Sequence, residues 1–192
     1  MSIVSPEHVS NDALLVAFAN GDPIAAQTLT ERLMPKLYAH AFHRLGHRAD
    51  AEDVAQEAFL RLWKIAPNWK QDQAQVTTWL YRVVINLCQD WHRRKTPQDL
   101  ASVHEPEDTA RSPAEQMDEQ YRHSALYAAM WDLPDRQRLA VQLRHIDELS
   151  NPEIAEIMEL SIEAVESLIA RGKRKLTEIL QSQKPELGYS HG

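Results

Sequence analysis

Two short basic clusters are the clearest candidates for chemistry with a phosphate backbone. One is the run Arg93–Lys95, and the other joins Arg171 with the run Lys173–Lys175. The net charge of the chain is −7, which at first argues against a nucleic-acid partner. A phosphate backbone, however, docks where positive charge is concentrated locally, whatever the charge of the whole chain. The two clusters therefore predict two places at which the chain can hold nucleic acid.

Aromatic and basic side chains are mixed along residues 76–94, which lead into the first cluster. Unpaired bases need flat rings for stacking and cations near their phosphates, and this segment supplies both around the central Asn86. A plainer interpretation puts the tryptophans of the segment, Trp79 and Trp91, in a core, and we expect one of them to be buried there. The segment favours contact with a single strand.

An acidic and amide stripe lies along residues 51–65. Its members share one helix face at spacings i, i+3, i+4 and i+7: Asp53, Gln56, Glu57 and Leu60. Exposed beside Phe59, such a stripe suits docking to a basic protein partner. A solvated acidic face is the commoner interpretation, so the stripe alone does not decide between the two.

The histidines and the single cysteine give no convincing enzyme site. His40, His43 and His47 fall at i, i+3 and i+7 and could ligate zinc only if a fourth ligand came close. The sequence has no H-x-x-x-H with an adjacent glutamate and no nucleophile constellation. We expect surface histidines, a small core residue at Cys88, no metal, no cofactor and no enzymatic activity.

Helix signals dominate the chain, and no period-two strand is evident, so the expected fold class is all-α. Ser10 and Asp22 mark helix starts and Gly46 a helix end, while Asp50 is expected to cap a helix and Pro35 to kink or break one. The helices expected in the first half span residues 13–19, 24–45, 51–65 and 76–94.

Residues 150–182 have the layout of a helix-turn-helix, whose second helix enters the major groove of DNA. Ser150 and Glu153 form a capping box at the first helix. Glu159 falls in the turn where glycine is usual, and a non-glycine with positive φ costs about 1 kcal/mol there. The alternative is a plain helical hairpin, but the cations from Arg171 onward lack the acids that a solvated face would interleave.

Residues 96–121 separate two domains, expected at 10–95 and 122–182. This segment has seven acidic residues, one basic residue and three prolines, and it carries −6 of the net charge. It is predicted to be a flexible acidic linker. With no long apolar run, no secretory signal and one cysteine, the chain is expected to be cytoplasmic, without membrane insertion.

The ordered motifs resemble the extracytoplasmic-function sigma factors of the sigma-70 family. Residues 21–45, 51–63 and 78–90 resemble sigma region 2, whereas residues 133–138 and the capping box resemble sigma region 4, a winged-helix-like helix-turn-helix. The resemblance implies a bacterial factor that binds core RNA polymerase, recognises −10 and −35 promoter elements and initiates transcription of a regulon such as a stress response.

The resemblance also implies roles for individual residues. Those expected on the polymerase β′ clamp helices are Asp53, Gln56, Glu57 and Leu60. Those expected at the −10 element, beside the loop 68–75, are Thr78, Arg82, Asn86, Arg93 and Arg94. Those expected at the −35 element are Glu166, Ser167, Ala170, Arg171, Lys173 and Arg174. The β flap of polymerase and an anti-sigma factor are further partners of such proteins.

Departures from the family pattern leave the promoter sequence open. Glu159, Glu166 and Leu168 are unusual, and the −10 loop lacks the usual aromatic residue and glycine. Glu166 could hold the neighbouring Arg171 in one orientation and accept from a cytosine amino group. The alternative function is a stand-alone helix-turn-helix regulator, which would bind duplex DNA tightly without polymerase.

Overall fold

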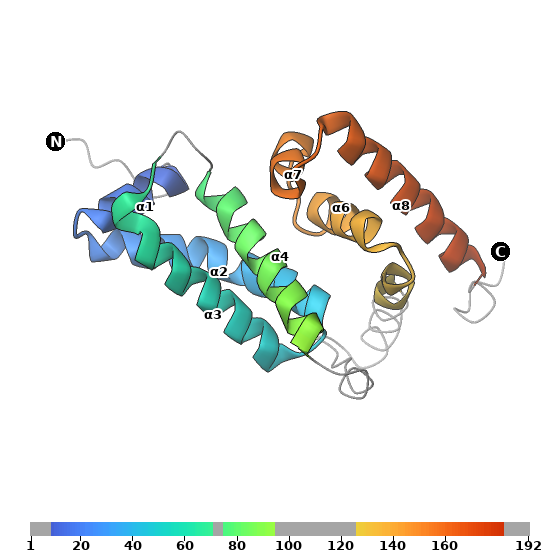
Figure 1. The fold of residues 1–192 in the computed structure, drawn as a ribbon, viewed down its shortest axis with the longest axis horizontal. Coiled ribbons are helices and arrows are strands. Elements are labelled where there is room, and N and C mark those ends of the chain that lie inside the picture. Colours follow the sequence, from blue (N-terminus) through green and yellow to red (C-terminus); the bar gives the residue numbers. More distant parts are fainter. Residues whose placement is uncertain (1–8, 71–74, 95–125, 183–192) are drawn as a thin grey trace, which may run out of the picture. The chain divides into compact units, whose positions relative to one another are not determined.

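The computed structural model describes residues 9–70, 75–94 and 126–182, and within them all regular elements are helices (Figure 1). The chain divides into two compact units, Met1–Glu105 and Pro106–Gly192. The all-α fold is therefore as the sequence predicts. The expected acidic linker, residues 96–121, and positions 71–74 of the expected −10 loop lie outside the described residues.

The first unit begins with sharply defined helix boundaries. Its elements are α1 Asn11–Ala19, α2 Pro23–Leu45, α3 Arg48–Ile65, the 3-10 helix η2 Ala66–Asn68 and α4 Val76–Arg94. Ser10 caps α1 by accepting from the Ala13 N–H, and Asp22 caps α2 by accepting from the Ile24 N–H at 2.9 Å. Gly46 ends α2 in the left-handed region at φ 66°. These boundaries were readable from the sequence.

Two expectations about this unit are wrong. Helix α2 runs through Pro35 without a break, because Leu33 and Leu37 on either side of it are both buried and hold the helix against the core. Helix α3 begins at Arg48, with His47 rather than Asp50 at its N-cap. His47 Nδ1 lies 2.8 Å from Asp50 Oδ2 and 3.5 Å from the Asp50 amide, so the carboxylate contact is the stronger of the two.

Helix α2 is the centre of the first unit and packs against α1, α3 and α4. Its buried leucines meet those of the other helices in one apolar core. The largest fully buried side chains of this core are Leu15, Leu29, Leu37, His40, Leu62, Val76, Leu80, Tyr81 and Val84. The ring of His40 meets that of Tyr81 edge-on at 5.2 Å between centroids. Burial raises the pKa of the Cys88 thiol to about 11, which fits its expected place in the core.

The second unit contains the expected helix-turn-helix. Residues 126–131 are helical, followed by α6 Asp135–His145, α7 Asn151–Met158 and α8 Ile162–Ser182. The capping box is formed in full: Ser150 accepts from the Glu153 N–H, and Glu153 Oε2 accepts from the Ser150 N–H at 2.8 Å. Glu159 ends α7 in the left-handed region at φ 54°, as the turn requires.

Close packing of α6 on α8 depends on Gly172. A Cβ atom added to this residue would lie 2.6 Å from Val141 Cγ2 and 3.3 Å from the Gln137 carbonyl oxygen. The glycine thus lets the two helices approach where any side chain would collide. Within the described ranges 9–70, 75–94 and 126–182, no helix has both the length and the apolar character of a membrane span.

Candidate polymerase and nucleic-acid interfaces

The stripe predicted on α3 is exposed. Asp53 and Gln56 face solvent, Leu60 is 63% exposed, and Glu57 is half-buried with Oε1 accepting from Arg61 Nε at 2.7 Å. Phe59 is buried at 3% exposure, so the expectation that it accompanies the stripe is wrong. The helix turns Phe59 inward because it follows Ala58 on the face that packs into the core.

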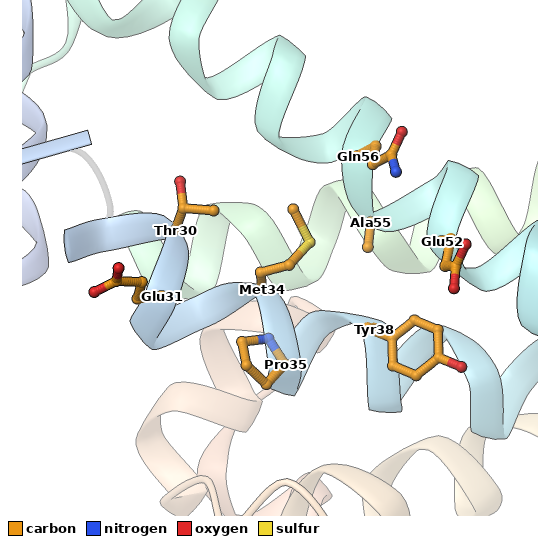
Figure 2. Close-up of a pocket in the computed structure, with 8 residues that line it drawn as sticks. All are labelled: Thr30, Glu31, Met34, Pro35, Tyr38, Glu52, Ala55 and Gln56. Atoms are coloured by element: carbon orange, nitrogen blue, oxygen red, sulfur yellow. The ribbon is translucent and has the colours of Figure 1, made fainter. Parts of the chain in front are cut away.

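An open hollow of about 500 Å³ lies between α2 and α3 and borders the stripe (Figure 2). Its lining comes from both helices: Thr30, Glu31, Met34, Pro35, Tyr38, Glu52, Ala55 and Gln56. The Met34 side chain extends from α2 toward α3, and Gln56 belongs to both the hollow and the stripe (Figure 2). Glu31 and Glu52 make the margin acidic, while the rest of the lining is largely apolar. Nothing in the sequence pattern indicated this hollow, because it needs two helices.

Helix α4 presents most of the residues predicted at the −10 element. Asn86, Arg93 and Arg94 are exposed, and Arg82 is half-buried. Thr78 is 1% exposed and belongs to the core, so this side chain is not available to a DNA strand in this structure. It is buried because it follows Val76 and precedes Leu80 and Tyr81 on the inward face of the helix.

The tryptophans of this region are half-buried, so the expectation that one of them is a core residue is wrong. The ring of Trp79 meets that of Trp69 edge-on at 6.2 Å, and Trp91 meets His92 in the same way at 5.1 Å. Tyr81 is the aromatic residue of α4 that fills the core. Arg93 forms an ion pair with Asp90 one turn earlier, which holds its guanidinium at the end of the helix.

Helix α8 presents the residues predicted at the −35 element on its outer face. Glu166, Ala170, Arg171, Lys173 and Arg174 are exposed and Ser167 is half-buried. The opposite face is buried at Val165, Ile169 and Gly172. The helix therefore packs through one side and leaves the other accessible.

The contacts of Arg171 differ from the expectation. Its Nη2 donates to Ser167 Oγ at 2.7 Å and its Nε to the Ser167 carbonyl at 3.3 Å. Glu166 Oε1 instead accepts from Asn151 Nδ2 of α7 at 3.3 Å. The expectation that Glu166 orients Arg171 is wrong, because Ser167 lies one turn before Arg171 on the same face.

Positive charge gathers where α8 runs along α6. A hollow of about 310 Å³ is lined by Pro134, Gln137, Arg171, Arg174, Lys175 and Glu178. Lys175 Nζ lies 3.7 Å from Glu178 Oε2, a contact that offsets only one of the cations. Burial, then the charges of Lys173 and Arg144, lower the pKa of His145. Sequence reasoning missed His145, and no local pattern would have found it.

The three histidines of the candidate zinc site do not converge. His40 is fully buried, which corrects the expectation of a surface residue, His43 lies against the Phe42 ring and His47 caps α3. Across the residues that the structure describes, no group of three or more histidine, cysteine, aspartate or glutamate side chains is placed to hold a metal ion. One exposed apolar residue was also missed, Ile162, which is 41% exposed at the start of α8.

Comparisons with known families agree with these two units. Residues 29–98 match Sigma-70 region 2, and residues 123–176 match Sigma-70 region 4. An aromatic and basic helix in one unit and a helix-turn-helix in the other thus define a transcription initiation factor of the sigma-70 class.

Curated relatives narrow the class. The ECF RNA polymerase sigma factor SigE of Mycolicibacterium smegmatis is 32% identical over 181 residues, which cover 90% of this chain and 69% of the relative. SigW of Bacillus subtilis is 30% identical over 179 residues, with 84% and 91% covered. The chain belongs to the extracytoplasmic-function sigma factors, which are non-enzymatic initiation factors that direct RNA polymerase to promoters. The predicted family and function are confirmed.

Solved structures agree on the fold. CnrH, in a complex with the cytosolic domain of CnrY, has a TM-score of 0.69 and 24% identity and covers 90% of this chain and 97% of its own. RpoE of Bartonella quintana, in a complex with the anti-sigma factor NepR, has a TM-score of 0.61 and 23% identity, with 81% and 96% covered.

Proposed function

We propose that this sigma factor divides its contacts among three exposed helix faces: α3 for core polymerase, α4 for the −10 element and α8 for the −35 element. The domains predicted at 10–95 and 122–182 would then carry two faces and one face, respectively. The observation that carries this proposal is the outer face of α8. Arg171 stands there exposed and braced by Ser167, on the second helix of a helix-turn-helix.

The −35 assignment follows from the geometry of that motif. The second helix of a helix-turn-helix lies in the major groove, where arginine pairs with guanine O6 and N7. A guanidinium held by its own helix loses less freedom when it binds a base. Lys173 and Arg174, which follow on the exposed surface, suit the phosphate backbone, since cations there add affinity without reading sequence.

The −10 assignment rests on the exposed surface of α4. Asn86 presents an amide, which can both donate to and accept from the edge of an unpaired base, while Trp79 offers part of an aromatic ring. Arg93 and Arg94 end the helix with exposed cations for a phosphate backbone. Thr78 is left out of this surface because it is buried.

The polymerase assignment rests on the α3 stripe and the adjoining hollow. Asp53 and Glu57 offer carboxylates to a basic partner, Leu60 offers an exposed apolar anchor, and the hollow offers a largely apolar recess with an acidic margin. We propose that the β′ clamp helices of polymerase bind this surface. Contacts with the β flap, binding of an anti-sigma factor and control of a stress regulon stay predictions.

The test is a transcription assay with purified core polymerase and a library of promoters, with start sites sequenced. As a base reader, Arg171 should lose about 1–3 kcal/mol of promoter binding when replaced by alanine, with relaxed preference at one base pair of the −35 element. Lys173→Ala is the matched control and should weaken all promoters about equally. Identical sequence preferences for wild type and Arg171→Ala would remove the base-reading role.

A further inference from the structure

Two polar side chains of α1 hold the first turn of α4. The backbone N–H of Val76 donates to Asp12 Oδ1 at 3.2 Å, although the two residues lie 64 positions apart. Next along the helix, Thr77 Oγ1 accepts from Asn11 Nδ2 at 3.0 Å. Helix caps usually come from the residue just before the helix, so this carboxylate reaches α4 from an uncommon place (Figure 1).

The same region of α1 is tied to α2. Arg32 Nη1 donates to Asn11 Oδ1 at 3.3 Å and to the Val9 carbonyl at 2.6 Å. These contacts are part-buried, which limits competition from water. The carboxylate of Asp12 also lies at the positive end of the α4 dipole, where a negative charge is favoured. We call Asn11, Asp12, Arg32 and Thr77 the α1 clamp.

The α1 clamp acts on the helix that carries the proposed −10 surface. Trp79 follows within the first turn, and Arg82 and Asn86 lie further along the same helix. Because an α-helix is stiff over this length, its first turn sets the rotation and direction of the side chains beyond it. We propose that Asn11 and Asp12 are positioning residues, which orient α4 for capture of the unpaired promoter strand; this inference rests on the proposed −10 function of α4.

Packing of α1 does not depend on the clamp alone. Leu14 and Leu15 are both buried against the unit, and Ser10 caps α1 locally. Asp12→Ala should therefore remove the cap of α4 while α1 stays docked. Asp12→Asn keeps an oxygen that accepts from the Val76 N–H, so it is the conservative variant.

The experiment uses the full chain with core polymerase on one promoter. Permanganate reactivity of unpaired thymines measures strand opening at saturating holoenzyme, and titration measures affinity for core. Asp12→Ala should lower the fraction of open promoter about five-fold, as expected for loss of one helix cap, with core affinity and closed complexes unchanged. Asp12→Asn should restore most of the opening. Asp22→Ala, which removes the local cap of α2, should leave opening unchanged.

Two further measurements separate this inference from the function on which it rests. Asn86→Ala tests α4 itself: if it impairs opening and Asp12→Ala does not, the positioning role is overturned and the −10 function stands. If Asn86→Ala opens normally, the −10 function fails and the inference fails with it. Hydrogen exchange at the amides of residues 76–79 should quicken in Asp12→Ala. Parallel loss of core affinity and opening would show a general structural role and overturn the inference.

Discussion

The two helices proposed to contact DNA are held in place in opposite ways. On α8, the key arginine is braced by Ser167 four residues before it, and the motif starts with a capping box within four consecutive residues. On α4, the first turn is fixed by α1, whose contacting residues lie 64 and 66 positions earlier in the sequence. The −35 surface is therefore built mostly from local contacts, while the −10 surface depends on the tertiary fold of its unit.

This contrast suits the proposed tasks. A duplex presents the same groove to every helix that enters it, so a locally braced reading helix is sufficient. A separated strand has no fixed shape, so its binding surface must itself be rigid to offset the ordering of the strand. The long-range contacts at α4 supply that rigidity.

The largest effect is expected on the first unit's polymerase surface. Asp53→Lys with Glu57→Lys should weaken binding to core polymerase by about 2–5 kcal/mol, because a buried partner charge is left unpaired. A titration of core measures it, with circular dichroism to show that the helices persist. Arg61→Ala is the matched control: it frees Glu57 from its ion pair and should keep or improve affinity. Unchanged affinity in the double reversal would remove the clamp-helix assignment.

A smaller effect is expected where α8 does depend on a distant contact. Gly172→Ala places a methyl group against Val141 and should destabilise the second unit by about 1–3 kcal/mol through overpacking. Hydrogen exchange in the full chain should quicken along α6 and α8 and stay unchanged in α2 and α3. Adding Val141→Ala should recover part of the loss. A variant as stable as the wild type would mean that α6 and α8 can separate without cost.

The smallest effect is expected at the turn between α7 and α8. Glu159 has φ 54°, so Glu159→Gly should relieve left-handed strain and stabilise the second unit by up to about 1 kcal/mol. Slower amide exchange in α7 and α8 is the readout. Glu159→Ala keeps a Cβ and should give no such gain. If the glycine variant exchanges faster than the wild type, side-chain contacts of Glu159 outweigh the strain.

The sequence predicts those features of the fold that arise within one turn of helix. Ser10, Asp22 and the capping box at Ser150 were placed correctly because a cap is a local contact. Pro35 was misjudged because tertiary packing on both sides holds α2 together. His47 was missed as a cap because histidine is uncommon there.

The candidate sites follow the same rule. The α3 stripe and the outer face of α8 could be predicted because helical periodicity alone defines which residues share a face. Thr78 could not be placed, since only the packing of α4 shows that this side chain points inward. The hollow beside Gln56, the close approach at Gly172 and the cap from Asp12 all join residues that are distant in sequence.

The burial of Cys88 has a practical consequence for measuring the motions of this protein. It is the only cysteine of the chain, its side chain is fully buried, and its pKa of about 11 leaves roughly one molecule in ten thousand as thiolate at neutral pH. A thiol reagent should therefore label the native chain only when the first unit opens, at a rate set by the opening equilibrium. One natural residue thus serves as a clock for the opening of the first unit, silent to events in the second, and free or polymerase-bound protein can be timed with it without adding a probe.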